Sequence, residues 1–323
     1  TENVEKILIL IDQAKPKTFL ANTKRKNSVS KKKLIGSEPK RLFTFGCSFT
    51  NYEWATWANI LGKELDCQFF NFGRSGAGNH YIFNIIQQTD AVYNFTHNDL
   101  VIVQWTNVSR EDRYNTEYED GPWITPGNIY SQNVYDKNFV EEYFSELGAY
   151  IRDLALIKAT HQSMINKTQL HFLQMNNIMQ QTDQWTDKTI DVRHLNELYK
   201  STIQMILPSF YNILYDNNIQ NKFKKDHQTI SNAFMDGHPS PMEHYTLLQT
   251  VFEHDFKQST INAVRQAQTQ WIKMLQDASH NKKNFRIFDM DQQWIKKLYQ
   301  DTIIKPGEAP HDSISTLNGL SQS

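Results

Sequence analysis

The chain has 323 residues, which is enough for one large domain or two small ones with an ample core. A formal net charge of -1 gives no overall attraction to nucleic acid or to a membrane surface. Two cysteines do not make a disulfide framework, and no apolar run approaches the length needed to span a bilayer.

A basic segment precedes the first strong strand pattern. Residues 23–41 are rich in lysine and poor in large apolar side chains, which is typical of a solvated linker or arm. The alternative is an arm that docks on an acidic partner or on nucleic acid. The apolar stretch before it follows acidic residues and has no plain cleavage site, so we expect a short helix or strand there and no signal peptide.

Strand and helix patterns alternate from residue 41 onward. Short apolar runs predict buried strands at 41–46, 67–73, 99–105 and 169–175. Helical spacing predicts the segments 54–66, 79–94 and 138–165, and a polar loop with several aromatic residues covers 111–137. The alternation favours a mostly parallel sheet with helices on both faces, which is a three-layer α/β/α sandwich with doubly wound, flavodoxin-like topology.

The periodicity weakens beyond residue 176. We expect helices at 194–216, with a break at Pro208, and at 260–278, and a late strand at 285–291. Four regions follow from these patterns: a segment with the basic arm, the α/β domain, a helical extension packed on that domain and a flexible tail. Their expected ranges are 1–40, 41–256, 257–304 and 305–323.

Polar residues and glycines follow the predicted strands where the carboxyl ends of a parallel sheet bind ligands. The first strand ends in "FGCSFT" with Ser48, the second in "NFGRSGAGN" with Gly76, and the third in "VIVQWTN" with Asn107. Much later comes "DGHPS", with Asp236 and His238.

These residue types fit acyl transfer by a serine nucleophile. A serine hydroxyl needs a base within hydrogen-bond reach, which His238 would supply, and Asp236 would orient its imidazole. A tetrahedral intermediate needs hydrogen-bond donors for its oxyanion, which the N–H groups of Ser48 and Gly76 and the Asn107 amide would provide.

With these four blocks in this order, the chain resembles an SGNH (GDSL-type) hydrolase over residues 41–240. The resemblance implies Ser48 as nucleophile, His238 as base, Asp236 as its orienting acid, and Gly76 and Asn107 as the oxyanion hole. The chain departs from the family pattern in four places. Cys47 stands where an aspartate usually precedes the serine, and Trp105-Thr106-Asn107-Val108 stands where Gly-x-Asn-Asp is usual. The acid and base are spaced Asp-x-His, and about eighty residues follow the last block.

Each of these residues also has a simpler interpretation. Ser48 could cap a helix, and Cys47 could be a rival nucleophile, although a buried structural thiol fits better. A metal site is another interpretation, with Asp236, His238, Glu243 and His244 as ligands. These residues lack the spacing that is usual for metal ligands.

Two further residues border the predicted pocket. Arg110 could bind an anionic group of a substrate, although most surface arginines are only solvated. Trp105 could stack on a sugar ring, and core packing is its alternative.

The sequence therefore predicts a serine esterase that hydrolyses a short-chain acyl ester, O-acetyl for preference, on a small molecule or a glycan, with no metal and no organic cofactor. The alternative is a structural or binding subunit of a larger assembly, for example a virus particle, with the N-terminal arm contacting a protein partner. A nucleic-acid partner is not expected, since no reading motif is present. The expected location is the cytoplasm or a virus particle.

Overall fold

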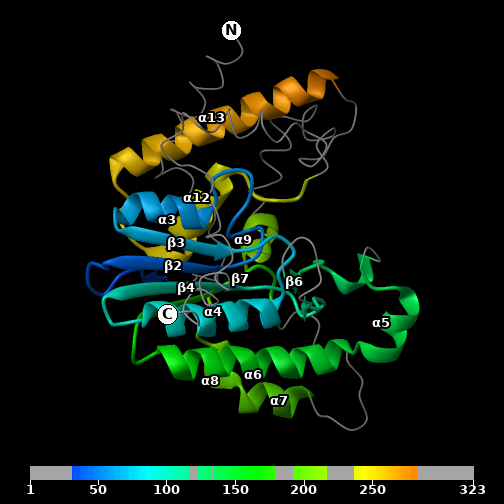
Figure 1. The fold of residues 1–323 in the computed structure, drawn as a ribbon. Helices are drawn as coiled ribbons and strands as arrows, with labels where there is room; N and C mark the ends of the chain where they lie inside the picture. The colour runs from blue at the N-terminus through cyan, green and yellow to red at the C-terminus, as the bar shows by residue number, and fades with distance from the viewer. Residues whose placement is uncertain (1–30, 116–121, 132–133, 179–191, 217–235, 282–323) are drawn as a thin grey trace, which may run out of the picture. The chain divides into compact units, whose positions relative to one another are not determined.

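The computed structural model describes residues 31–115, 122–131, 134–178, 192–216 and 236–281. Within the part of the chain from Lys32 onward, parallel strands lie between two layers of helices (Figure 1). The predicted strand at 285–291 and the predicted tail at 305–323 lie outside the described residues. No helix in the described ranges combines the length and apolar character needed to cross a bilayer.

Four parallel strands form the central sheet in the order β3-β2-β4-β7. They are β2 (Arg41–Gly46), β3 (Gln68–Gly73), β4 (Asp99–Trp105) and β7 (Gln169–Gln174). The mostly parallel α/β fold predicted from the sequence is confirmed, with each strand within one residue of its expected ends. The winding direction changes between β2 and β4, and loops at such a switch point form the ligand-binding crevice of these sheets.

Alternate strand residues pack into two apolar clusters, one on each face of the sheet. The helices involved are α3 (Trp57–Leu65), α4 (Asn79–Tyr93), α6 (Glu146–Met164), α12 (Pro241–Val251) and α13 (Gln258–Asn281). Phe43 and Val101 belong to the cluster under α4 and α6, whereas Leu42 and Ile102 belong to the cluster under α3, α12 and α13. The burial of both faces explains why these strands are continuous apolar runs.

Two predicted helices begin or end elsewhere in the structure. The helix expected at 54–66 begins at Trp57, because Thr56 and Asn59 form a capping box there. The single helix expected at 138–165 is two helices, α5 (Lys137–Tyr143) and α6. Ser145 caps α6 by accepting from the Gly148 N–H at 3.2 Å, so the chain stops one helix and starts another at this point.

The segment after β7 is also interrupted. Helices α7 (Val192–Leu198), α8 (Lys200–Ile203) and α9 (Phe210–Asp216) replace the helix expected at 194–216, and the predicted break at Pro208 lies between the last two. The Leu207 N–H donates to the Phe172 carbonyl at 2.8 Å. This part of the chain therefore runs beside β7 before α9 begins.

The last residues of the basic segment are not a solvated arm. Strand β1 (Lys32–Lys33) pairs in parallel with β8 (Phe252–Glu253), and Leu34 is fully buried in the cluster under α3 and α12. The expectation of an arm is wrong for these residues, because a leucine within the basic run supplies an apolar anchor. Residues 1–30 lie outside the described part, and the four-region division stays a prediction.

Candidate active site

The turn after β2 places Ser48 at the carboxyl edge of the sheet. The N–H groups of Thr50 and Asn51 both donate to the Cys47 carbonyl, at 2.9 and 3.2 Å, and close a tight turn around Ser48. Gly46 is required before this turn, since a Cβ there would lie 2.1 Å from Thr50 Oγ1. Ser48 is only 6% exposed, so it is almost entirely surrounded by protein groups.

Buried hydrogen bonds fix this turn to its neighbours. Thr50 Oγ1 donates to Gln104 Oε1 on β4 at 2.9 Å. The Thr50 carbonyl accepts from Thr56 Oγ1 at 2.6 Å and from Asn71 Nδ2 on β3 at 3.0 Å. Because every one of these groups is buried, breaking one bond would leave an unsatisfied polar atom, and the turn has little freedom to move.

Ser48, His238 and Asp236 form one continuous hydrogen-bonded chain. Ser48 Oγ lies 2.7 Å from His238 Nε2, and His238 Nδ1 lies 2.5 Å from Asp236 Oδ1. A carboxylate accepts only, so Nδ1 carries the ring proton and Nε2 is free to accept from the serine hydroxyl. Chemically, such an arrangement allows a hydroxyl to act as a nucleophile, an imidazole as its base and a carboxylate as the group that orients the base.

Asp236 is 5% exposed at its side chain, whereas His238 is 25% exposed. Burial alone would raise the pKa of Asp236, but hydrogen bonds from His238 and Tyr52 and the charge of His238 outweigh it and hold this pKa below its usual value. Asp236 is therefore a carboxylate at neutral pH. The His238 backbone N–H also donates to Asp236 Oδ1, at 2.9 Å, which holds the two residues together despite their short Asp-x-His spacing.

The loop that carries His238 is anchored on both sides. Trp54 Nε1 donates to the Pro239 carbonyl at 2.7 Å. Immediately afterwards, Ser240 and Glu243 form a capping box at the start of α12, with a proline in its first turn. The capped start of α12 therefore fixes the position of His238, which lies two residues before the capping serine.

Strand register brings the other predicted site segments to the same edge of the sheet. Gly46 at the end of β2 pairs with Gly73 at the end of β3, and Phe45 pairs with Val103 on β4. The loops that follow these three strands therefore begin at similar heights. Gly76 lies in the second loop and Asn107 in the third.

Gly76 and Asn107 both present uncommitted donors. Gly76 has φ +74, and a Cβ there would lie 2.0 Å from the Thr125 carbonyl oxygen, so only glycine fits. Asn107 Oδ1 accepts from the Ser109 N–H at 3.0 Å, which leaves the amide nitrogen free. Within the described ranges, no hydrogen bond uses the backbone N–H of Ser48 or Gly76, or the side-chain N–H of Asn107.

Two buried acids support these loops. Asp112 accepts from the N–H of Gly78 at 2.8 Å and of Tyr81 at 2.9 Å, and thereby caps α4 from another segment. Burial raises the pKa of Asp112, against the opposing effect of these two donors. Asp153 on α6 accepts from Asn79 Nδ2 at 2.7 Å.

Asn79 connects the second loop to the third. Its Oδ1 accepts from the Thr106 N–H at 2.8 Å, and its Nδ2 donates to the Thr106 carbonyl at 3.1 Å. Burial raises the pKa of Asp153 to about 7, although the charge of Arg152 and the hydrogen bond from Asn79 act against this shift. The residue next to Asn107 is therefore held in place by a buried polar network.

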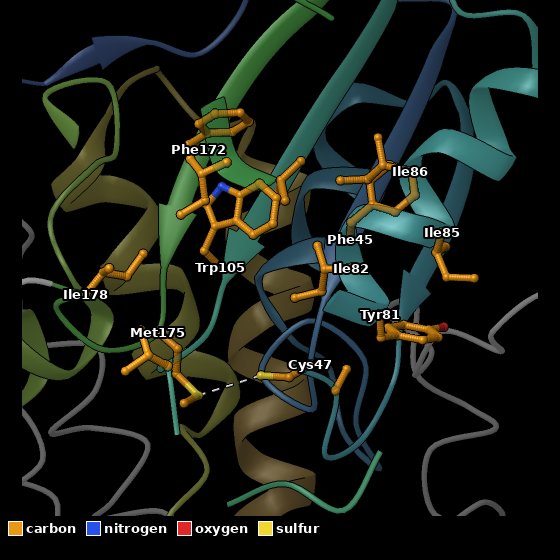
Figure 2. Packing of buried hydrophobic residues seen from close by; sticks show 14 of the residues in the cluster. Phe45, Cys47, Tyr81, Ile82, Ile85, Ile86, Trp105, Phe172, Met175 and Ile178 are labelled. Carbon is orange, nitrogen blue, oxygen red and sulfur yellow. Dashed lines mark hydrogen bonds between the residues drawn. The ribbon is translucent and has the colours of Figure 1, made fainter. Parts of the chain in front are cut away.

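Arg110 lies against the same loops. Its Nη1 donates to the Ala77 carbonyl at 2.6 Å, and its Nη2 lies 3.8 Å from Met175 Sδ. Met175 in turn is 3.6 Å from Cys47 Sγ, and Figure 2 shows these two sulfur atoms pointing toward one another. Arg110 is thus connected by two short contacts to the residue that precedes Ser48.

Trp105 has no surface for a substrate. Its side chain is 0% exposed and lies edge-on to Phe172 in the core, as Figure 2 shows. This position corrects the interpretation of Trp105 as a substrate-binding residue, and core packing explains it. Cys47 is fully buried as well, which agrees with a structural thiol.

The structure gives no support to a metal site at Asp236, His238, Glu243 and His244. In the ranges that the structure describes, no group of three or more His, Cys, Asp or Glu residues could hold a metal ion. Glu243 accepts from the Ser240 N–H at 2.8 Å, and His244 is buried, where burial and the nearby His238 lower its pKa to about 3.

Sequence reasoning missed Tyr52, Asp112 and Asp153. Tyr52 lies four residues after Ser48, and its hydroxyl donates to Asp236 Oδ2 at 2.5 Å. No spacing pattern in the sequence links Tyr52 to Asp236, which lies 184 positions later. An aspartate in the middle of a helix with apolar neighbours, such as Asp153, was the available signal for a buried polar network.

No protein-family model matches this chain, and no curated protein matches it. Solved structures do show similarity. A gut microbial diltiazem-metabolizing enzyme is 11% identical with a TM-score of 0.37, and the match covers 68% of this chain and 47% of that chain. The chain thus spans about half the length of that enzyme.

Two further similar structures are shorter proteins that are matched almost completely. An acetyl xylan esterase from Geobacillus stearothermophilus is 16% identical with a TM-score of 0.31, over 68% of this chain and 99% of that chain. A proposed SGNH hydrolase from Slackia heliotrinireducens is 13% identical with a TM-score of 0.29, over 66% of this chain and 98% of that chain. SGNH hydrolases are therefore among the structures that resemble this one, at a level too low to transfer an activity.

Proposed function

We propose that this protein is a serine hydrolase of the SGNH type that cleaves carboxylic esters through a Ser48 acyl-enzyme. The observation that carries the proposal is the unbroken chain of hydrogen bonds from Ser48 Oγ through His238 to Asp236. A hydroxyl within 2.7 Å of an unprotonated imidazole nitrogen can lose its proton as it attacks a carbonyl carbon.

In the acylation step, Ser48 Oγ forms a bond to the ester carbonyl carbon while its proton moves to His238 Nε2. The carbonyl π electrons move to oxygen and give a tetrahedral oxyanion. The intermediate then collapses, the bond to the alcohol oxygen breaks, and His238 returns the proton to the leaving alcohol. Asp236 keeps its negative charge throughout and stabilises the imidazolium.

In the deacylation step, a water molecule replaces the alcohol. His238 takes a proton from water as its oxygen attacks the acyl carbon, and a second oxyanion forms. When the bond to Ser48 Oγ breaks, His238 returns the proton to the serine, and the carboxylic acid leaves. The enzyme ends in its starting protonation state.

The oxyanion is assigned to three donors: the backbone N–H groups of Ser48 and Gly76 and the side-chain N–H of Asn107. All three are uncommitted among the described hydrogen bonds. Removal of one such donor typically costs about 2.7–4 kcal/mol of transition-state stabilisation. The buried bonds of Asn79 to Thr106 hold the third loop in position, so these donors need little rearrangement during the reaction.

For the substrate we propose a short acyl group, O-acetyl, on a carbohydrate or a similar polar alcohol. Ser48 is almost fully buried, which leaves little room for a long acyl chain. Strands β5 (Arg113–Tyr114) and β6 (Trp123–Ile124) pair in antiparallel fashion near Gly76, where the Gly127 N–H donates to the Gly76 carbonyl at 3.0 Å. Tyr114 on β5 is about half exposed, and such rings stack on sugars.

The proposal is tested by hydrolysis of p-nitrophenyl acetate and p-nitrophenyl palmitate by the parent protein and by Ser48→Ala. We expect turnover of the acetate, little turnover of the palmitate, and a loss of at least a thousandfold in the variant. Ser163→Ala is the matched control, since Ser163 Oγ donates to the Thr160 carbonyl within α6. Equal rates in the parent and Ser48→Ala would overturn the proposal and favour the alternative of an assembly subunit that retains the fold.

A further inference from the structure

Tyr52 makes two different contacts with the acid and base of the proposed site. Its hydroxyl donates to Asp236 Oδ2 at 2.5 Å. Its ring lies parallel to the His238 imidazole, with centroids 3.8 Å apart and planes 16° apart. We propose that Tyr52 is a positioning residue that sets both the orientation and the charge balance of the His238–Asp236 pair. This inference rests on the proposed function.

The hydrogen bond divides the Asp236 carboxylate between two partners. Oδ1 accepts from the ring and the backbone N–H of His238, and Oδ2 accepts from Tyr52. A carboxylate held at both oxygens cannot rotate away from the imidazole. Tyr52 also withdraws part of the negative charge that would otherwise stabilise the imidazolium, so this bond favours the neutral base.

The stack has the opposite electrostatic effect. The face of a tyrosine ring carries negative charge density, which attracts a cation that lies over it. When His238 takes the proton from Ser48, its positive charge develops 3.8 Å from the Tyr52 ring. The stack therefore favours the imidazolium that forms as the serine attacks, and it also fixes the plane of the imidazole.

Two uncharged aromatic side chains, Trp54 and Phe49, pack against the stacked pair of Tyr52 and His238. Trp54 lies edge-on to the Tyr52 ring at 4.7 Å and prevents the ring from moving away. Phe49 also contacts His238, with ring centroids 5.3 Å apart and planes tilted by 59°. Neither of these side chains carries a charge.

The titratable groups that face His238 are Asp236, Tyr52 and His244, with Glu53 near Tyr52. Burial, and then the charges of Asp236 and Glu53, raise the pKa of Tyr52, so its hydroxyl remains a donor throughout the physiological range. His244 stays neutral because burial and His238 lower its pKa to about 3.

The two effects can be separated by two substitutions at one position. Tyr52→Phe keeps the stacked ring and removes only the hydrogen bond to Asp236. Tyr52→Leu removes both the bond and the stack. Tyr130→Phe is the control, since its hydroxyl donates to another carboxylate, Glu146, at 3.1 Å and involves neither Asp236 nor His238.

The direct measurement is an NMR titration of the His238 imidazole in the full chain. The chain has 11 histidines, and the signal that is missing in His238→Asn identifies the right one. We expect the His238 pKa to rise by about half a unit in Tyr52→Phe, since Asp236 regains charge. In Tyr52→Leu it should lie about half a unit below that of Tyr52→Phe, since the ring no longer stabilises the cation.

The rates provide the second readout. The limb of the kcat/KM pH profile that reports His238 should move in the same directions as the NMR values. For p-nitrophenyl acetate, kcat should fall about tenfold in Tyr52→Phe and further in Tyr52→Leu, with KM little changed, because Tyr52 is assigned no contact with substrate. Tyr130→Phe should move neither the titration nor the profile.

The inference is overturned if His238 titrates at the same pH in the parent, Tyr52→Phe and Tyr52→Leu while all remain folded by circular dichroism. A common shift of the same size in both variants would also contradict it, since the stack would then contribute nothing. The titration needs no substrate. A parent protein without esterase turnover would therefore refute the proposed function and still leave the role of Tyr52 to be decided by NMR.

Discussion

Ser48 Oγ and His238 Nε2 lie 2.7 Å apart, although 190 positions separate the two residues in the chain. The turn after β2 presents the serine, and the capped start of α12 presents the histidine. Both are held by buried hydrogen bonds to other elements, so the contact depends on the whole fold. Changes that loosen either support should therefore reduce activity before they unfold the protein.

Replacement of Asp236 by asparagine should reduce activity strongly with little effect on the fold. The amide keeps the shape of the side chain, but its N–H group would face His238 Nδ1 and favour the wrong tautomer. We expect kcat to fall about ten-thousandfold with KM within a few-fold of the parent value. Initial rates with p-nitrophenyl acetate measure this effect, and a loss below tenfold would show that Asp236 does not orient the base.

Two helix caps offer a matched comparison. Ser240 caps α12 next to the histidine loop, and Ser145 caps α6 away from it. Ser240→Ala and Ser145→Ala should each lower the free energy of unfolding by about 1 kcal/mol. Only Ser240→Ala should also reduce kcat, since it loosens the segment that carries His238. Urea denaturation and initial rates measure the two effects, and equal loss of activity in both variants would contradict the assignment.

Asp153 should make stability fall as the pH rises from about 4 to about 7. Its folded pKa of about 7 lies above the value of about 4 expected in an unfolded chain, so the folded state binds more protons in that window. The free energy of unfolding should decline there by up to about 1.4 kcal/mol per pH unit and level off above it. Asp153→Asn should remove this component.

Denaturant titrations at several pH values measure the Asp153 effect. The parent and Asp153→Asn should differ in the slope of stability against pH between about 4 and 7, whatever their absolute stabilities. Identical slopes would mean that the Asp153 carboxylate stays ionised beside Arg152 throughout, and that the ion pair between them, at 2.9 Å, outweighs burial.

Arg110 should distinguish anionic from neutral esters. Arg110→Gln keeps a donor for the Ala77 carbonyl and removes the charge. For an acetyl ester that carries a carboxylate, we expect KM to rise about tenfold, which corresponds to the loss of one charge-assisted hydrogen bond. The kinetics with neutral p-nitrophenyl acetate should change little. Arg113→Gln is the control, since Arg113 already pairs with Glu111 at 3.0 Å. A similar KM for both ester types in Arg110→Gln would remove the anion-binding role.

The central sheet could be predicted from the sequence, whereas several local features could not. Runs such as 41–46 and 99–105 are apolar because both faces of the strands are buried, and that pattern needs no knowledge of the partner. The break before Ser145 was missed because apolar spacing continues across it, although a serine followed by an acidic residue was an available signal for a new helix.

The site could be predicted only in part. The order of the blocks indicated Ser48, Asp236 and His238, but the distance between them depends on how the loop before α12 returns to β2. Trp105 was misinterpreted because a residue at the end of a strand can face either the pocket or the core. Tyr52 was missed because its two contacts arise from the return of a distant loop, which no local pattern encodes.

The measurement that tests the central claim most directly is covalent labelling by a fluorophosphonate, with the modified peptide located by mass spectrometry. The reagent reacts with a serine only when a neighbouring base activates it. We expect the label on Ser48, at a much lower rate in His238→Asn, and none at that position in Ser48→Ala. A label on another residue with Ser48 unmodified, or no label on a protein that still hydrolyses esters, would contradict the account.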